Sequence, residues 1–390
     1  MQQKIYIQRL RLENQVRQCI EESPATVLLG ARQTGKTTLA QHLVKDLPNV
    51  HFFDLERAAA RAALSTPELT LGELTGTIII DEVQRMPELF EVLRPLCDRS
   101  EGSTRFLLLG SASPNLIRGV SESLAGRALF VHIPGFALEE TGPQSQSRLW
   151  LRGAFPRSYL ADSDAASSRW RESFVQSFLE RDMPQLGIRV PAETLRRFWL
   201  MLSHYHGQTW NGSEIARSID VSLPTARHYL DILSGAYATR LLPPWFENIK
   251  KRQVKSPKIY VRDSGLLHYL LGIDSTMGLR TNPRYGASWE GFALEQVLAI
   301  CGDRQAYFWA TQRGAELDLL LFHRGRRLGF EFKCADAPRM TKSMHIALQD
   351  LDLHQLYVVY PGEQSYPLHE DVLVIPLTQI MSRVANSSSE

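Results

Sequence analysis

The 390-residue chain has few cysteines, no long hydrophobic run and almost no excess of charge of either sign. Its four cysteines are scattered, without the spacing of a metal site or a disulfide framework. No apolar stretch approaches the roughly 18 residues that a membrane span needs. The first residues are polar and lack the apolar core of a secretory signal peptide. We therefore expect a cytoplasmic protein with free thiols and no membrane partner.

The balance of charge limits what the whole surface can bind. The formal net charge is only +2, so any surface for nucleic acid must be local rather than spread over the molecule. Hydrophobic residues make up 44% of the chain and charged residues 22%, which is ordinary for a globular protein. The length is sufficient for roughly two to four domains.

Residues 26–39, TVLLGARQTGKTTL, contain a complete G-x-x-x-x-G-K-[ST] phosphate-loop motif between an expected strand and an expected helix. Gly30 and Gly35 allow the backbone to curl so that amide groups point at phosphate oxygens. Lys36 would reach the β- and γ-phosphates of ATP, and the Thr37 hydroxyl would ligate Mg²⁺. The predicted nucleotide-binding residues are Gly30, Ala31, Arg32, Gln33, Thr34, Gly35, Lys36, Thr37 and Thr38.

A second buried strand, at 78–80, ends in the acidic pair Asp81-Glu82. Ligands of open α/β sheets collect at the carboxyl ends of the strands. Asp81 would hold the Mg²⁺ ion, and Glu82 would orient and polarise the attacking water. The alternative is an acidic pair that only caps the following helix.

A third buried strand, at 106–109, ends near Ser111. The Ser111 hydroxyl could touch the γ-phosphate or the water as a sensor, or it could serve only as a turn residue or helix cap. Strands and helices alternate through this region after the phosphate loop. That alternation predicts a doubly wound α/β domain with a parallel sheet.

Four segments carry a family resemblance: GARQTGKTTL, IIIDEVQRMP, FLLLGSAS and SLAGRALFVHIPGF. In this order and spacing they resemble prokaryotic ATPases of the AAA superfamily, in particular a family that adds a winged helix and a nuclease-like C-terminal domain. The resemblance implies that Arg127 is an arginine finger acting on a neighbouring subunit, and hence that the protein forms an oligomer. Arg118 and Arg85 are rivals, and a structural salt bridge is the alternative for Arg127.

Two short helices, at 214–219 and 223–233, have the spacing of a helix-turn-helix. Strands at 241–246 and 258–261 would form a wing, and its tip at 248–255 carries four positive charges and no negative one. Such a tip suits phosphate contacts, although a solvated loop or a protein-binding helix-turn-helix remains the alternative. The predicted DNA-binding residues are Thr225, Arg227, His228, Lys250, Lys251, Arg252 and Lys255.

The last part of the chain resembles the PD-(D/E)XK nuclease core. Glu290 lies on an expected helix, Asp318 on a strand, and Glu331 and Lys333 project from one side of the next strand. Alternation of Leu317, Leu319 and Leu321 would place Asp318 on the opposite face of its strand. Asp318 and Glu331 could ligate Mg²⁺ and Lys333 could stabilise phosphate charge. Salt bridges are the alternative, and we expect a folded domain without cleavage.

These observations predict four domains: an AAA-type ATPase domain at 1–142, a helical lid at 143–192, a winged helix at 193–265 and a nuclease-like domain at 266–382. The predicted function is ATP hydrolysis, with Mg²⁺, coupled to the remodelling or processing of bound DNA. The alternative is a nucleotide-switched regulator that hydrolyses slowly, binds protein through its winged helix and has an inert C-terminal domain.

Overall fold

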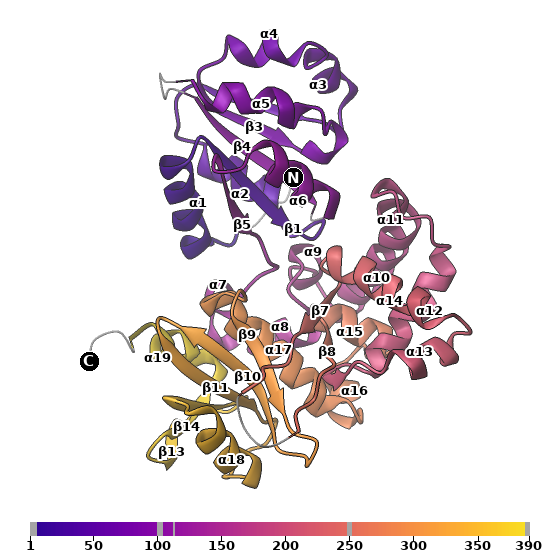
Figure 1. Ribbon diagram of the computed structural model, residues 1–390, viewed down its shortest axis with the longest axis vertical. Helices are drawn as coiled ribbons and strands as arrows, with labels where there is room; N and C mark the ends of the chain where they lie inside the picture. The colour runs from indigo at the N-terminus through magenta and orange to yellow at the C-terminus, as the bar shows by residue number, and fades with distance from the viewer. Residues whose placement is uncertain (1–5, 100–103, 112–113, 248–251, 387–390) are drawn as a thin grey trace. The chain divides into compact units, whose positions relative to one another are not determined.

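The computed structural model describes residues 6–99, 104–111, 114–247 and 252–386. The chain divides into two compact units (Figure 1). The first unit comprises the N-terminal residues through Phe136 together with Gly235–Tyr237, and the second comprises the rest. In the described part of the chain, no helix combines the length and apolar character needed to cross a lipid bilayer. The four-domain division drawn from the sequence stays a prediction.

The first unit is built on a five-stranded sheet in the order β2-β3-β4-β1-β5. All four neighbouring pairs are parallel, so the carboxyl ends of the strands meet at one edge. The strands are β1 (Ala25–Gly30), β2 (Val50–Asp54), β3 (Gly76–Asp81), β4 (Thr104–Ser111) and β5 (Ala128–His132). The helices are α1 (Leu10–Glu22), α2 (Lys36–Leu43), α3 (Ala58–Ala63), α4 (Pro67–Gly72), the 3₁₀ helix η1 (Val83–Arg85), α5 (Leu89–Cys97) and α6 (Pro114–Ser123).

Successive side chains of the central strands point into two separate hydrophobic cores. In β3, Ile78 and Ile80 pack with residues of α5 and α6, whereas Ile79 packs with residues of α1 and α2. A period of two is what a strand buried on both faces requires. The predicted α/β fold with a parallel sheet covered on both faces is therefore confirmed.

The second unit begins with helices: α7 (Leu138–Thr141), the 3₁₀ helix η2 (Pro143–Ser145), α8 (Gln146–Arg152), α9 (Pro156–Tyr159), α10 (Asp164–Ser177), the π-helix η3 (Phe178–Asp182), α11 (Met183–Gln185) and α12 (Ala192–His204). Arg171 of α10 is buried among them. Its Nη1 atom donates to the carbonyl oxygens of Leu151 (3.1 Å) and Gly265 (2.9 Å). This guanidinium satisfies buried backbone acceptors and ties α10 to α8 and to a later helix.

A small sheet in the order β6-β8-β7 follows. It consists of β6 (Gln208–Thr209), β7 (Thr239–Leu242) and β8 (Lys258–Val261), with helices α13 (Gly212–Ser218) and α14 (Leu223–Gly235). The prediction of a strand extending to residue 246 is wrong, because β7 ends at Leu242. Pro243 and Pro244 lack an amide hydrogen and cannot extend the ladder. The Pro243 carbonyl instead accepts from Phe308 (3.0 Å), and Trp245 donates to Phe308 (2.7 Å).

The C-terminal part contains a mixed sheet in the order β13-β14-β12-β11-β10-β9. Its strands are β9 (Ala306–Ala310), β10 (Glu316–His323), β11 (Arg326–Phe332), β12 (Gln355–Tyr360), β13 (Tyr366–His369) and β14 (Val372–Pro376). The accompanying helices are α15 (Ser264–Leu270), α16 (Thr276–Thr281), α17 (Tyr285–Cys301), α18 (Lys342–Leu351), the 3₁₀ helix η4 (Leu377–Gln379) and α19 (Ile380–Asn386). Strands β11, β12 and β14 run parallel, and the remaining pairs are antiparallel.

The predicted simple alternation in β10 is wrong at one point. The register with β9 shifts between Leu317 and Leu320, which marks a β-bulge. Leu317 and Leu320 consequently pack in the same core with Met344 of α18. Leu319 and Leu321 are buried elsewhere, so both faces of this strand are covered.

Candidate functional site

The phosphate-loop motif connects the end of β1 to the first turn of α2. Two of its residues adopt positive φ, Gln33 at 65° and Gly35 at 91°. A Cβ atom on Gly30 would lie 2.3 Å from the Ile133 carbonyl oxygen, so this position has no room for a side chain. The glycines therefore meet two separate requirements: close backbone approach at Gly30 and left-handed backbone at Gly35. Thr38, in the first turn of α2, is exposed, whereas Lys36 is buried.

The Lys36 ammonium folds back onto the loop. Its Nζ atom donates to the carbonyl oxygens of Ala31 (2.9 Å) and Gly30 (3.2 Å). The side chain is buried, and this burial lowers the pKa of Lys36 to about 8 despite the nearby carboxylates of Glu82 and Asp81. A phosphate oxygen entering the loop would compete with two neutral carbonyls for this cation.

Thr37 and Asp81 lie 44 positions apart in the chain and meet at the carboxyl edge of the sheet. The Thr37 hydroxyl donates to Asp81 Oδ2 at 2.6 Å. Burial raises the pKa of Asp81, and the hydrogen bond from Thr37 opposes that rise. The two motifs are thereby joined through oxygen atoms, which are the ligands that Mg²⁺ prefers.

Glu82 follows Asp81 in a left-handed conformation, with φ at 55°. It precedes η1 but makes no side-chain capping bond to it, so the capping alternative is not what the structure shows. The Gln84 amide donates to Glu82 Oε2 at 2.5 Å. Gln84 was missed in the sequence, although its place two residues after an acidic pair is the signal that could have identified it.

Ser111 is the last residue of β4 and lies opposite Gly30 in the parallel ladder. Its hydroxyl oxygen is buried and has no hydrogen-bond partner among the described residues. Buried hydroxyls are normally satisfied. An orphaned hydroxyl next to the phosphate loop is a fitting partner for a phosphate oxygen or for the water.

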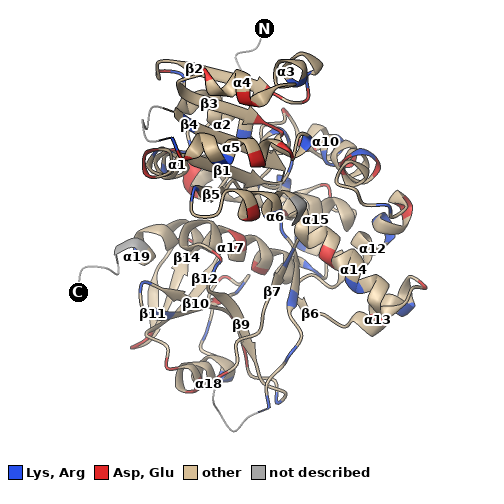
Figure 2. Ribbon diagram, turned by 45° about the horizontal axis from the view of Figure 1, so that its top comes forward, with Lys and Arg blue, Asp and Glu red and all other residues tan. Residues whose placement is uncertain are grey.

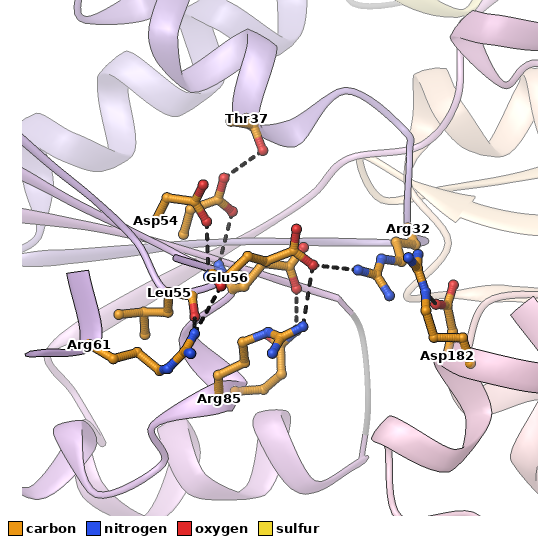
Figure 3. A network of polar contacts seen from close by, with 12 residues as sticks. Arg32, Thr37, Asp54, Leu55, Glu56, Arg61, Arg85 and Asp182 are labelled. Atoms are coloured by element: carbon orange, nitrogen blue, oxygen red, sulfur yellow. Dashed lines mark hydrogen bonds and ion pairs between the residues drawn. The ribbon is translucent and has the colours of Figure 1, made fainter. Parts of the chain in front are cut away.

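A cluster of opposite charges lies beside the loop. The Glu56 carboxylate accepts from Arg32 at 2.6 Å and from Arg85 at 3.3 Å (Figure 3). Arg85, a rival for the finger role, is thus held at the phosphate-loop edge of its own sheet. Arg118, the other rival, is exposed on α6. Nothing in the sequence indicated that Glu56 belongs to this site, because its two partners lie in distant segments of the chain.

Arg127 lies at the opposite, amino edge of the sheet. Its carbonyl accepts from the amide of Ala25, the first residue of β1, at 3.1 Å. Its guanidinium forms a two-pronged ion pair with Asp98, with Nε–Oδ1 at 2.6 Å and Nη2–Oδ2 at 2.8 Å. The length of strand β1 separates it from its own phosphate loop by roughly 17 Å. The salt bridge weighed as the alternative is present, and the finger role stays a prediction.

The predicted DNA-binding residues fall in two places in the second unit. Arg227 and His228 are exposed on α14, while Thr225 is half-buried and its hydroxyl bonds the Ser222 hydroxyl at 2.7 Å. Arg252 and Lys255 are exposed, whereas Lys250 and Lys251 lie outside the described residues. Basic and acidic residues are interspersed along the elements of both units (Figure 2). A binding surface therefore has to be local, as the composition predicts.

The residues of the nuclease-like motif come together between α17, β10 and β11. Lys333 Nζ lies 2.6 Å from Glu331 Oε2 and 3.9 Å from Asp318 Oδ2. The Phe332 amide donates to Asp318 Oδ2 at 3.0 Å. Burial raises the pKa of Glu331. The motif thus predicted which side chains meet.

Lys258 of β8 also enters this cluster and was missed. Its Nζ atom lies 3.1 Å from Glu290 Oε1 and 3.3 Å from Asp318 Oδ1, and it is ion-paired with Glu316 as well. Tyr260, two residues on, donates to Glu290 Oε1 at 2.6 Å. No group of three or more His, Cys, Asp or Glu in the described ranges is arranged to hold a metal ion. The predicted metal ligands Asp318 and Glu331 are paired with lysines in this structure. The sequence signal that could have identified Lys258 and Tyr260 is a polar pair two residues apart in an otherwise apolar strand.

Comparison with known proteins assigns the chain to a family. Over 376 residues it is 49% identical to the uncharacterized protein Rv2008c of Mycobacterium tuberculosis and, equally, to Mb2031c of Mycobacterium bovis. These alignments cover 96% of this chain and 85% of each relative. The chain belongs to the family of these two mycobacterial proteins.

Family models also match its parts. Residues 22–142 match an AAA domain, and residues 143–277 and 285–380 each match a domain of unknown function, DUF8612 and DUF4143 respectively. The predicted AAA-type P-loop domain is therefore confirmed. The winged helix and the nuclease-like domain stay predictions.

Two solved structures are similar over most of their own length. One is the Walker-type ATPase PABY2304 of Pyrococcus abyssi, at 15% identity and a TM-score of 0.48, covering 68% of this chain and 96% of that chain. The other is a single-residue variant of RuvB from Thermotoga maritima, at 17% identity and a TM-score of 0.29, covering 61% of this chain and 90% of that chain.

The residues at the carboxyl edge fit a nucleotide with Mg²⁺. The orphaned Ser111 hydroxyl and the buried Lys36 ammonium suit phosphate oxygens, and Thr37 and Asp81 present oxygen ligands. Thr37 and Asp81 would hold the Mg²⁺ ion, whose chemistry there would be neutralisation of phosphate charge.

Nucleotide binding is expected to weaken as the pH rises above about 8, the pKa to which burial lowers Lys36 in the free protein. A bound phosphate raises this pKa again, so between the two values binding takes up a proton and the dissociation constant rises about tenfold per pH unit. Calorimetric titration with ADP between about pH 7 and pH 10 measures this slope. Lys36→Met should bind ADP more weakly, and its dissociation constant should not depend on pH in this way. A dissociation constant of the unaltered protein that stays constant over this pH range would contradict the role of Lys36 in phosphate binding.

Proposed function

We propose that this protein binds ATP with Mg²⁺ at the carboxyl edge of its parallel sheet and hydrolyses it. The observation that carries the proposal is the hydrogen bond from Thr37 to Asp81, which joins the phosphate-loop motif to the acidic motif. The match of residues 22–142 to an AAA domain supports the same activity.

Each side chain at this edge has a task that its chemistry suits. Lys36 exchanges its two carbonyl partners for phosphate oxygens, which compensates their charge. Glu82 orients the attacking water and accepts its proton. The Gln84 amide positions the Glu82 carboxylate, and the Ser111 hydroxyl contacts the γ-phosphate or the water.

Glu82→Gln is expected to keep ATP binding and to lose at least about 10²-fold in hydrolysis rate, because an amide cannot accept the proton. Lys36→Ala should weaken ATP binding itself, since the phosphate charge is no longer compensated. Phosphate release and equilibrium binding of labelled ATP separate the two effects. Glu88→Gln, the same change at an exposed residue just before α5, is the matched control. Normal hydrolysis by Glu82→Gln would remove Glu82 from the mechanism.

We further propose that Arg127 acts in trans within an oligomer. Its place at the amino edge, the length of β1 away from its own phosphate loop, is compatible with a role only in another subunit's site. A guanidinium there would stabilise charge that develops on the γ-phosphate. Asp98 would hold the guanidinium in position until the subunits assemble.

Mixing Arg127→Ala with Glu82→Gln protein is expected to restore part of the ATPase activity, because some interfaces then combine an intact finger with an intact Glu82. Asp98→Ala separates the finger from a structural salt bridge. This variant removes the ion pair but keeps the guanidinium, so it should stay active. Absence of rescue at every mixing ratio with oligomers intact, or inactivation by Asp98→Ala equal to that by Arg127→Ala, would argue for a structural role.

For the second unit we propose a winged helix that binds DNA and a nuclease-like domain that does not cleave it. The order α12, β6, α13, α14, β7, β8 supports the first part, together with exposed Arg227 and His228 on α14. The exposed Arg252 and Lys255 supply sequence-independent phosphate contacts. ATP hydrolysis would then be coupled to remodelling or processing of that DNA.

Replacing Arg252 and Lys255 with Ala is expected to weaken duplex binding and to reduce the log–log salt slope by about 0.9 for each lost contact. Fluorescence anisotropy over a range of salt concentrations measures this slope. The matched control is the Arg339→Ala, Lys342→Ala pair, which removes two exposed positive charges near α18. An unchanged salt slope would indicate that DNA binds to another surface of the protein. ATP turnover indifferent to DNA would favour a protein-binding regulator.

A further inference from the structure

We propose that the Lys258 ammonium is the resident cation of the acidic cluster at Glu290, Glu316 and Asp318, in the place where a nuclease would hold a divalent metal ion. This inference concerns the second unit alone and does not depend on ATP hydrolysis. It gives a physical reason for a nuclease-like fold that does not cleave.

The Lys258 ammonium lies among three acidic side chains. Its Nζ atom is 3.1 Å from Glu290 Oε1 and 3.3 Å from Asp318 Oδ1, with Glu316 as a third acidic partner. Only 5% of the lysine side chain is exposed. Oxygen-ligated Mg²⁺ lies about 2.1 Å from each ligand, so a metal shared by Glu290 and Asp318 would need the space that Nζ fills.

Other groups of the protein donate hydrogen bonds or form ion pairs to the same carboxylates and to Glu331. Tyr260 donates to Glu290 Oε1 at 2.6 Å, and the Phe332 amide donates to Asp318 Oδ2 at 3.0 Å. Lys333 pairs with Glu331 at 2.6 Å. The Phe308 ring lies 5.8 Å from Lys258 Nζ and adds a cation–π contact. Four carboxylates are thus served by two lysines, a phenol and a backbone amide.

The lysine comes from a different sheet from the acids it serves. Lys258 and Tyr260 belong to β8 of the three-stranded sheet, whereas Asp318 belongs to β10 of the six-stranded sheet and Glu290 to α17. The buried ion pairs therefore join these two parts of the unit, a joint that a free metal ion would not make. Removing Lys258 leaves the carboxylates with a buried negative charge that needs another cation.

The test asks whether loss of the tethered ammonium creates a site for a free cation. All proteins carry Asp81→Asn, which removes the carboxylate proposed to ligate Mg²⁺ at the phosphate site, and Mn²⁺ is the probe. Four proteins are compared by electron paramagnetic resonance and thermal unfolding: the parent, its Asp318→Asn derivative, its Lys258→Met derivative and the derivative with both changes. Lys342→Met, the same change at an exposed position in the same unit, is the matched control.

We expect no Mn²⁺ on the parent or the control, and about one ion per chain on the Lys258→Met derivative. At roughly a hundredfold excess of Mn²⁺ over its dissociation constant, that derivative should gain about 5 °C in Tm, and Asp318→Asn should abolish the gain. A derivative that folds only with Mn²⁺ would support the proposal equally.

Two results would overturn it. One is Mn²⁺ bound to the parent and lost on Asp318→Asn, which would mean that a metal displaces Lys258. The other is a folded Lys258→Met derivative that binds no Mn²⁺. If the Lys258→Met derivative folds neither with nor without Mn²⁺, Mn²⁺ binding by the parent protein decides. Binding that is lost on Asp318→Asn rejects the proposal, and absence of binding supports it.

Discussion

The hydrogen bond between Thr37 and Asp81 depends on one constraint, the parallel register of the five-stranded sheet. Because all strands of this sheet run the same way, the phosphate loop after β1, the acidic pair at the end of β3 and Ser111 at the end of β4 arrive at a single edge. The alternating burial of Ile78, Ile79 and Ile80 holds that register, since a slip by one residue would exchange the two cores.

Charges around this sheet are held in place by partners before any ligand arrives. At the carboxyl edge, Lys36 rests on backbone carbonyls, and Arg32 shares the Glu56 carboxylate with Arg85. At the amino edge, Asp98 accepts two hydrogen bonds from the Arg127 guanidinium. Such pre-positioned groups lose less side-chain freedom on binding than free side chains would.

The second unit uses charge for a different purpose. Its buried acids are paired with Lys258 and Lys333, and the first of these lysines also links two sheets. Buried ion pairs of this kind add little net stability, yet losing one partner is costly. They are therefore well suited to fixing how two parts of a fold are joined. A similar role falls to Arg171, which bonds backbone carbonyls of two other helices.

Local pattern was enough to predict the α/β class, the strands around the phosphate loop, and the meeting of Asp81 with Thr37 through motifs of known geometry. That Glu290, Asp318, Glu331 and Lys333 meet was implied by the resemblance to a nuclease core and not by local pattern, because Glu290 lies on a helix and the others on or beside two strands. The partners that come from distant segments became visible in the folded chain alone: Glu56 for Arg32, Asp98 for Arg127 and Lys258 for the acidic cluster. The reason is that an ion pair between distant residues produces no periodic pattern in the sequence, whereas burial of one face of a strand or helix produces a periodic pattern of apolar residues.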